Sequence, residues 1–115
     1  MDLKELEIQN LTRQCNETLI LFILVDGDKH GYQLSLEIEE RSGGLFRFNH
    51  GTLYPILHKL EKEGWIRGNW RKEDSKRKRR SYALTDRGRK HAVAQREAWR
   101  RFFGTFFSIV GEVDP

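Results

Sequence analysis

The residues of this sequence best suited to chemistry are a cluster of lysines and arginines. Between positions 67 and 80 the chain has eight basic and two acidic residues, a net charge of +6. The whole 115-residue chain carries only +4, and residues 1–26 carry −3. Clustered lysine and arginine bind phosphates by displacing their counterions. A solvated loop is the plain alternative, but such a concentration of one sign favours a polyanion-binding element.

The other reactive side chains form no pattern typical of catalysis or metal binding. Histidines occur at four scattered positions, His30, His50, His58 and His91, with no metal-ligand spacing such as i and i+4. Cys15 is the only cysteine, so no intrachain disulfide and no cysteine-based zinc site can form. Because Cys15 lies in a largely apolar stretch, an inert buried thiol is expected. We therefore expect no enzyme, no metal site and no cofactor.

Hydropathy excludes a membrane span. The longest uninterrupted apolar run is residues 19–25, whereas a spanning helix needs about 20 apolar residues. The amino terminus shows no basic start leading into an apolar segment, so no secretory signal is visible. We expect a cytoplasmic protein without a membrane partner.

Apolar periodicity predicts the elements that must position the basic cluster. One long helix, or two in succession, is predicted over about 2–25, and another over about 30–41. A third helix runs from about 50 or 51 to 63. Pro55 is tolerated only in a first turn, so this helix should begin close to Gly51 or Thr52. Two strands of a hairpin follow, over 65–70 and 80–84, and a basic loop over 71–79 joins them. The last helix then runs to about position 112, and Thr85 is expected to cap its beginning.

Three helices, a hairpin and a long helix make a winged helix-turn-helix protein, mainly α (α+β) in class. Residues 1–84 are expected to form the DNA-binding domain, with the wing hairpin at about 65–84. Residues 85–115 are expected to form a C-terminal dimerisation helix that packs with residues 2–25 as one structural unit. The third helix would be the recognition helix, because one helix fits the major groove.

Double-stranded operator DNA is therefore the expected partner. Four of the predicted DNA contacts on the helices have a plainer alternative. His58 and Lys59 would simply be exposed to solvent, Tyr54 would be a half-buried packing residue, and Tyr32 would belong to the core. Wing contacts to phosphates or the minor groove would contribute affinity without much sequence choice. The predicted DNA contacts are Tyr32, Gln33, Asn49, His50, Thr52, Tyr54, His58 and Lys59 on the helices, and Lys76, Arg77, Lys78, Arg79 and Arg80 on the wing.

The last helix carries more apolar surface than one small domain can cover. Four of the seven phenylalanines lie between positions 102 and 107. Large exposed apolar patches mark interfaces, and a two-fold symmetric dimer suits a protein that reads two half-sites. We therefore predict a homodimer. Its interface residues would be Leu19, Phe22, Trp99, Phe102, Phe103, Phe106, Phe107, Ile109 and Val110.

Four segments are similar to those of a known family. Gly51–Gly64 resembles the recognition helix of PadR-like transcriptional regulators almost residue for residue. His30–Leu34 and Glu40–Gly44 resemble the second helix of that family, and Arg80–Gly88 resembles its closing strand and the start of its last helix. The resemblance implies a dimeric winged helix-turn-helix protein that is usually a repressor and often responds to a small molecule.

The amino-terminal helix and Trp99 resemble those of the short, multidrug-sensing members. In those members a tryptophan at this place in the last helix lines a ligand pore at the dimer interface. Trp99, Phe103 and Phe106 are spaced at i, i+4 and i+7, so across a two-fold axis they would sandwich a small planar aromatic effector. Leu11 and Cys15 would complete the pocket wall. The alternative is that these aromatic residues pack together and leave no pocket.

A second class of function stays open at this stage. Winged-helix folds also serve as protein-interaction or adaptor modules without specific operator binding, and a fold does not by itself determine function. The charge of the wing favours DNA.

Overall fold

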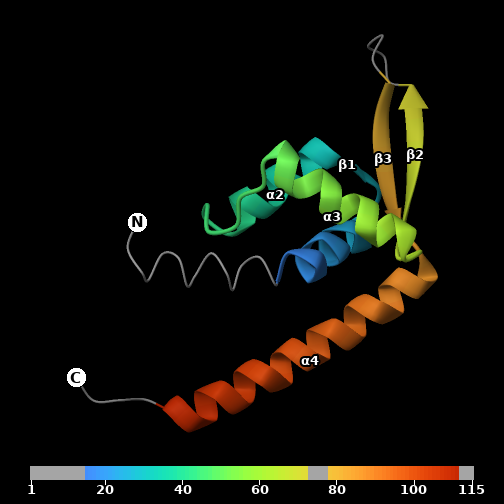
Figure 1. The fold of residues 1–115 in the computed structure, drawn as a ribbon. Coiled ribbons are helices and arrows are strands. Elements are labelled where there is room, and N and C mark those ends of the chain that lie inside the picture. Colours follow the sequence, from blue (N-terminus) through green and yellow to red (C-terminus); the bar gives the residue numbers. More distant parts are fainter. Residues whose placement is uncertain (1–14, 73–77, 112–115) are drawn as a thin grey trace.

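The computed structural model describes residues 15–72 and 78–111. A helix over residues 15–23 continues into a short 3-10 helix, and three strands and three further helices follow (Figure 1). In chain order they are η1 (Leu24–Asp26), β1 (Lys29–His30), α2 (Gly31–Arg41), α3 (His50–Lys62), β2 (Ile66–Lys72), β3 (Lys78–Leu84) and α4 (Asp86–Val110). The predicted fold class is confirmed; residues 1–14 of the predicted first helix lie outside the described part.

The sheet has three antiparallel strands in the order β1-β3-β2. In β1, Lys29 pairs with Tyr82 and His30 with Ser81. This strand was not predicted, because two residues are too few to show an alternating pattern. Because α2 follows β1 directly, the pairing of β1 with β3 fixes the start of α2 beside the base of the wing.

The wing strands are longer than predicted. Arg71 pairs with Arg79 and Lys72 with Lys78, so only residues 73–77 remain between the strands. The prediction of a loop over 71–79 was wrong, because charged residues show no apolar alternation while their backbones still continue the antiparallel ladder.

The core lies where the helix over 15–23, α2, α3 and the base of the sheet meet. Its fully buried side chains include Ile20, Leu34 and Leu57. Only Gly88 and Ala92 of α4 are buried, both near its beginning. Figure 1 shows α4 leaving the base of the hairpin and running toward the C-terminus away from α2 and α3. The first helix touches it, since Thr18 Oγ1 donates to Gln95 Oε1 at 2.8 Å.

Two helix starts decide how the site is positioned. Thr85 caps α4 as predicted, because its Oγ1 accepts from the Gly88 amide at 2.9 Å while donating to the Gly64 carbonyl at 2.7 Å. α3 begins at His50, which puts Pro55 in the second turn rather than the first. The restriction of Pro55 to the first turn was therefore wrong. The proline leaves the Gly51 carbonyl without its helical donor, and Gly51 is exposed to water.

Candidate nucleic-acid interface

Four predicted contacts come together at the beginning of α3. Asn49 caps the helix, and its Oδ1 accepts from the Thr52 amide at 2.9 Å and from Thr52 Oγ1 at 3.0 Å. His50 and Tyr54 stack, with ring centroids 5.6 Å apart and planes 4° from parallel. Asn49 and His50 are exposed, whereas Thr52 and Tyr54 are half-buried. The helix therefore presents two exposed polar side chains, Asn49 and His50, at its amino-terminal end.

α2 places a further side chain beside this end of α3. Tyr32 is 62% exposed, so the alternative that it belongs to the core is wrong. It shares a hollow of about 210 Å³ with Asn49 and His50. The side chain of the neighbouring Gln33 already makes a hydrogen bond to the backbone, because its Oε1 accepts from the His30 amide at 2.9 Å. Tyr32, rather than Gln33, is the freer of the two to meet a ligand.

The far end of α3 is held by the first helix. Lys59 Nζ lies 2.5 Å from Glu17 Oε1, and this hydrogen bond and the charge of Glu17 raise the pKa of the lysine. His58 is exposed. Part of the positive charge predicted for this face is thus already paired within the protein.

The structure describes the two strands of the wing but not the residues 73–77 that connect them. Lys76 and Arg77 lie outside the described residues, as do the side chains of Lys78 and Arg79. Arg80 is half-buried, and its Nη2 donates to Glu61 Oε2 on α3. Of the five predicted wing contacts, only Arg80 has a described side chain, and that side chain is directed toward the protein.

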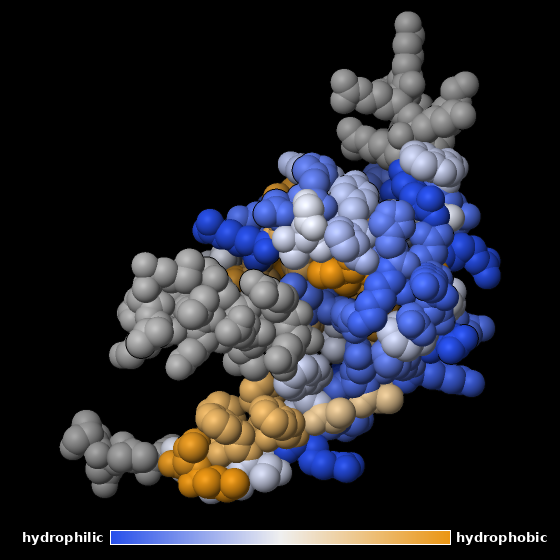
Figure 2. Space-filling model, in the orientation of Figure 1, coloured by the Kyte–Doolittle hydropathy of each residue, from blue (hydrophilic) through white to orange (hydrophobic). Residues whose placement is uncertain are grey.

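These residues lie on the polar side of the molecule. In Figure 2, hydrophilic side chains cover the body and the hairpin, while a continuous hydrophobic area lies over the C-terminal half of α4. Exposed large apolar side chains there include Phe102, Phe107 and Ile109, the last 78% exposed. The chain thus separates a polar face on α3 and the wing from an apolar face on α4.

Three of the predicted effector residues, Trp99, Phe103 and Phe106, lie on α4. The rings of Trp99 and Phe103 stack at 5.5 Å, and both lie on α4. Phe106 lines an open apolar hollow on the same helix that Trp99 does not line. Cys15 is half-buried, and burial raises the pKa of its thiol. Leu11 lies outside the described residues.

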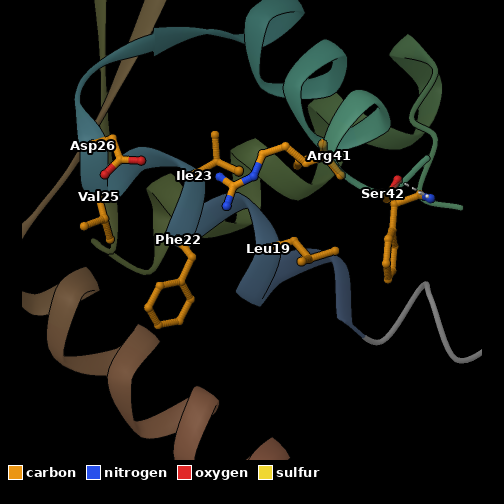
Figure 3. A pocket seen from close by; sticks show the side chains of 9 residues that line it. Leu19, Phe22, Ile23, Val25, Asp26, Arg41 and Ser42 are labelled. Atoms are coloured by element: carbon orange, nitrogen blue, oxygen red, sulfur yellow. Dashed lines mark hydrogen bonds between the residues drawn. The ribbon is translucent and has the colours of Figure 1, made fainter. Parts of the chain in front are cut away.

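Two further predicted interface residues, both on the first helix, line a groove between that helix and α2. Leu19 and Phe22 lie at one edge of an apolar groove of about 460 Å³ (Figure 3). Figure 3 shows the ring of Phe22 pointing toward α4, where the guanidinium of Arg96 lies 5.4 Å from its centroid. The groove therefore opens beside the apolar helix.

Sequence reasoning missed three residues that surround Arg80: Glu61, Gly68 and Trp70. Trp70 pairs with Arg80 across the hairpin, and Gly68 pairs with Tyr82. The hairpin register would have placed Trp70 opposite Arg80, since the first predicted strand ends at Trp70 and the second begins at Arg80. No local pattern points to Glu61.

No metal site or membrane span is found in the described residues. Over residues 15–72 and 78–111, no three histidine, cysteine or acidic side chains are grouped so that they could hold an ion. No helix in those ranges combines the length and apolar character needed to cross a bilayer.

The helices, the two-stranded wing and the exposed start of α3 define a winged helix-turn-helix protein. The sequence pattern of the transcriptional regulator PadR-like family matches residues 20–94. The chain therefore belongs to the PadR-like family, whose members are transcriptional regulators and not enzymes.

Three relatives illustrate the match. The chain is 37% identical over 79 residues to transcriptional regulator Rv3488 of Mycobacterium tuberculosis, covering 69% of this chain and 70% of that protein. A transcriptional regulator from Clostridium thermocellum superposes with a TM-score of 0.81 at 28% identity, over 89% of this chain and 96% of that one.

The third relative was solved with DNA. The negative transcriptional regulator PadR of Bacillus subtilis is 33% identical over 70 residues, which are 61% of this chain and 38% of that protein. Its structure in complex with operator DNA matches with a TM-score of 0.63 at 29% identity, over 69% of this chain and 45% of that one.

Proposed function

We propose that this chain is a dimeric repressor that binds a specific operator through α3 and the wing. The observation that carries this proposal is the start of α3, where exposed Asn49 and His50 stand beside exposed Tyr32. A groove-reading helix needs such polar side chains at its amino-terminal end. PadR of Bacillus subtilis, a negative regulator, was solved with operator DNA. That relationship supports the same role here.

The proposed contacts fall into two groups. The first group surrounds the start of α3 and contacts base edges or nearby phosphates. It comprises Tyr32, Asn49, His50, Thr52 and Tyr54. Phosphate contacts would come from the second group, which sets affinity rather than sequence choice. That group comprises Gln33, His58, Lys59, Lys76, Arg77, Lys78 and Arg79.

A titration with two duplexes tests the function. The DNA upstream of the chain's own gene is compared with a scrambled duplex of the same length, by anisotropy at fixed salt. We expect preference for the upstream duplex, and His50→Ala should reduce that preference more than Lys90→Ala, which changes an exposed residue of α4. Equally weak binding to both duplexes would contradict the repressor and support an adaptor role.

We infer that α4 forms the dimer interface. Its C-terminal half exposes Phe102, Phe106, Phe107, Ile109 and Val110, and such a patch on a small protein is typical of an interface. The groove beside Leu19 and Phe22 is apolar, and the end of α4 from a second copy would fill it. Trp99 and Phe103 would then lie close to the two-fold axis.

Sedimentation tests the interface. Ile109→Glu puts a charge on the exposed apolar face, so it should yield a folded monomer, whereas the matched Lys90→Glu should remain a dimer. A dimeric Ile109→Glu variant would overturn this assignment.

We further propose that a small planar aromatic effector binds near Trp99 in the dimer. The supporting observation is the stack of Trp99 and Phe103 on a helix whose outer face is open to a partner. Planar dyes should quench the fluorescence of the wild type and leave Trp99→Ala unaffected, since Trp65 and Trp70 lie on other elements. Quenching that persists in Trp99→Ala would contradict this site.

A further inference from the structure

We propose that Arg80 is a positioning residue that fixes the wing against the recognition helix and makes no contact with DNA. This inference rests on the proposed DNA-binding function, but it assigns Arg80 differently from its basic neighbours. The guanidinium of Arg80 is held between β2, β3 and α3.

The polar contact of Arg80 is made within the protein. Its Nη2 donates to Glu61 Oε2, near the carboxyl end of α3. The two side chains are only 28% and 29% exposed. Arg80 Nε is buried and finds no hydrogen-bond partner among the residues that the structure describes. A charge shielded in this way depends on its one carboxylate partner, so it is poorly placed to meet a phosphate.

Two aromatic rings fix the rest of the guanidinium. Arg80 Cζ lies 5.7 Å from the ring centroid of Trp70, its cross-strand partner, and 5.8 Å from that of Tyr82. Both distances are within the range in which a guanidinium is attracted to a ring face. Tyr82 is buried in the core with 2% exposure, whereas Trp70 is exposed on the wing. Arg80 therefore connects the core to the outer surface of the hairpin.

A glycine provides the space that the guanidinium occupies. A Cβ at Gly68 would overlap Nε, Cζ and Nη2 of Arg80. The backbone of Gly68 does not have the positive φ that would itself require glycine. The absence of a side chain at this position thus serves the placement of Arg80.

The position of Arg80 affects how the wing and α3 bind DNA at the same time. A protein that reads a groove with a helix and contacts the backbone with a wing needs the two held at one angle. Lysine would not replace Arg80, because it lacks the planar fork that reaches Glu61 while lying against two rings. Breaking the pair should weaken binding without removing a phosphate contact.

The decisive variant is Glu61→Gln, because the two possible roles of Arg80 predict opposite signs. If Arg80 positions the wing, this variant weakens binding to the upstream duplex by roughly tenfold, the effect of losing a charged hydrogen bond. If Arg80 instead contacts phosphate, the variant releases Arg80 and removes a negative charge, so binding tightens. Glu40→Gln is the matched control, since it makes the same change at an exposed residue of α2.

The salt dependence gives a second readout that simple destabilisation would not reproduce. For Arg80→Met, the slope of log affinity against log salt should equal that of the wild type, although affinity falls. A phosphate contact would make the slope shallower by about one unit. Gly68→Ala should weaken binding in the same way as Arg80→Met. A shallower slope for Arg80→Met, or tighter binding for Glu61→Gln, overturns the proposal.

A measurement without DNA separates this inference from the proposed function. Amide hydrogen exchange in β2 and β3 should be faster in Glu61→Gln than in Glu40→Gln, because the hairpin is no longer held against α3. Equal exchange in the two variants contradicts the role of Arg80 even if the repressor function holds. Faster exchange supports that role even if the upstream duplex is not the operator.

Discussion

Gly88 lies directly against the carbonyl group of Trp65, so close that a Cβ at position 88 would overlap the carbonyl oxygen. Trp65 precedes β2, and Gly88 is in the first turn of α4. The same carbonyl accepts from the Thr85 amide at 3.1 Å. Backbone contact therefore sets the direction of α4 relative to β2, at the point where the proposed dimerisation helix joins the proposed DNA-binding domain.

Replacing Gly88 by alanine should destabilise the chain strongly. The added methyl group meets backbone, which cannot rotate away, so we expect a decrease of about 3 kcal/mol in the free energy of unfolding. Gly104→Ala in the same helix is the control, because a Cβ there meets nothing within 4 Å. It should stabilise the helix by roughly 0.5–1 kcal/mol. Urea unfolding of both variants checks this pair, and similar effects at the two positions would contradict it.

The position of the recognition helix could be predicted from sequence because it depends on local periodicity. Leu53, Leu57 and Leu60 recur at i, i+4 and i+7, a spacing that predicts one apolar face, and all three are buried. Once that face is set, the phase of the helix places His50 on the outside. The cap at Thr85 was predictable for a similar reason, since it needs only residues three positions apart.

The features that could not be predicted depend on contacts between residues that are distant in the chain. β1 exists because Lys29 lies beside Tyr82, which is 53 positions away in the chain. The basic character of Arg80 placed it in the wing cluster, but its direction depends on Glu61 and on the empty space at Gly68. Composition could not distinguish a charge that faces DNA from one that faces a carboxylate of the protein.

Cys15 gives a prediction about pH. Burial raises the pKa of its thiol above the ordinary value of 9.0, so the folded state favours the neutral form. The resulting contribution to stability is present below pH 9 and disappears as the pH rises through the higher folded pKa. Unfolding free energy should therefore fall above pH 9 more in the wild type than in Cys15→Ala.

The same shift should slow alkylation. At pH 8, iodoacetamide reacts with the thiolate, so the folded chain should react more slowly than the chain in urea. Mass spectrometry measures the single addition, because Cys15 is the only cysteine. Equal rates in the two states would show that the thiol is not protected.

The tip of the wing should supply affinity without sequence choice. Neutralising Arg77, Lys78 and Arg79 together should weaken binding to the upstream and scrambled duplexes alike. The slope of log affinity against log salt should become shallower by about one unit for each phosphate that the variant no longer binds. Lys90→Gln, an exposed change on α4, should leave the slope unchanged. An unchanged slope in the wing variant would contradict these contacts.

Glu17 provides the counterpart to Glu61. It pairs with Lys59, which is 59% exposed on α3 and is proposed to contact phosphate. Glu17→Gln frees that lysine, so binding to both duplexes should tighten by about two- to fivefold, as expected for an exposed ion pair. Glu40→Gln, an exposed change on α2, corrects for the altered net charge.

The two glutamates thus receive the same substitution and are expected to give opposite results. Neutralising Glu17 releases a cation that faces outward, whereas neutralising Glu61 releases the wing from the helix it is held against. Measured side by side at several salt concentrations, Glu17→Gln should steepen the salt dependence and Glu61→Gln should leave it unchanged. If both variants tighten binding, Arg80 belongs with Lys59 among the phosphate contacts. If neither changes binding relative to its control, α3 and the wing do not act together on DNA.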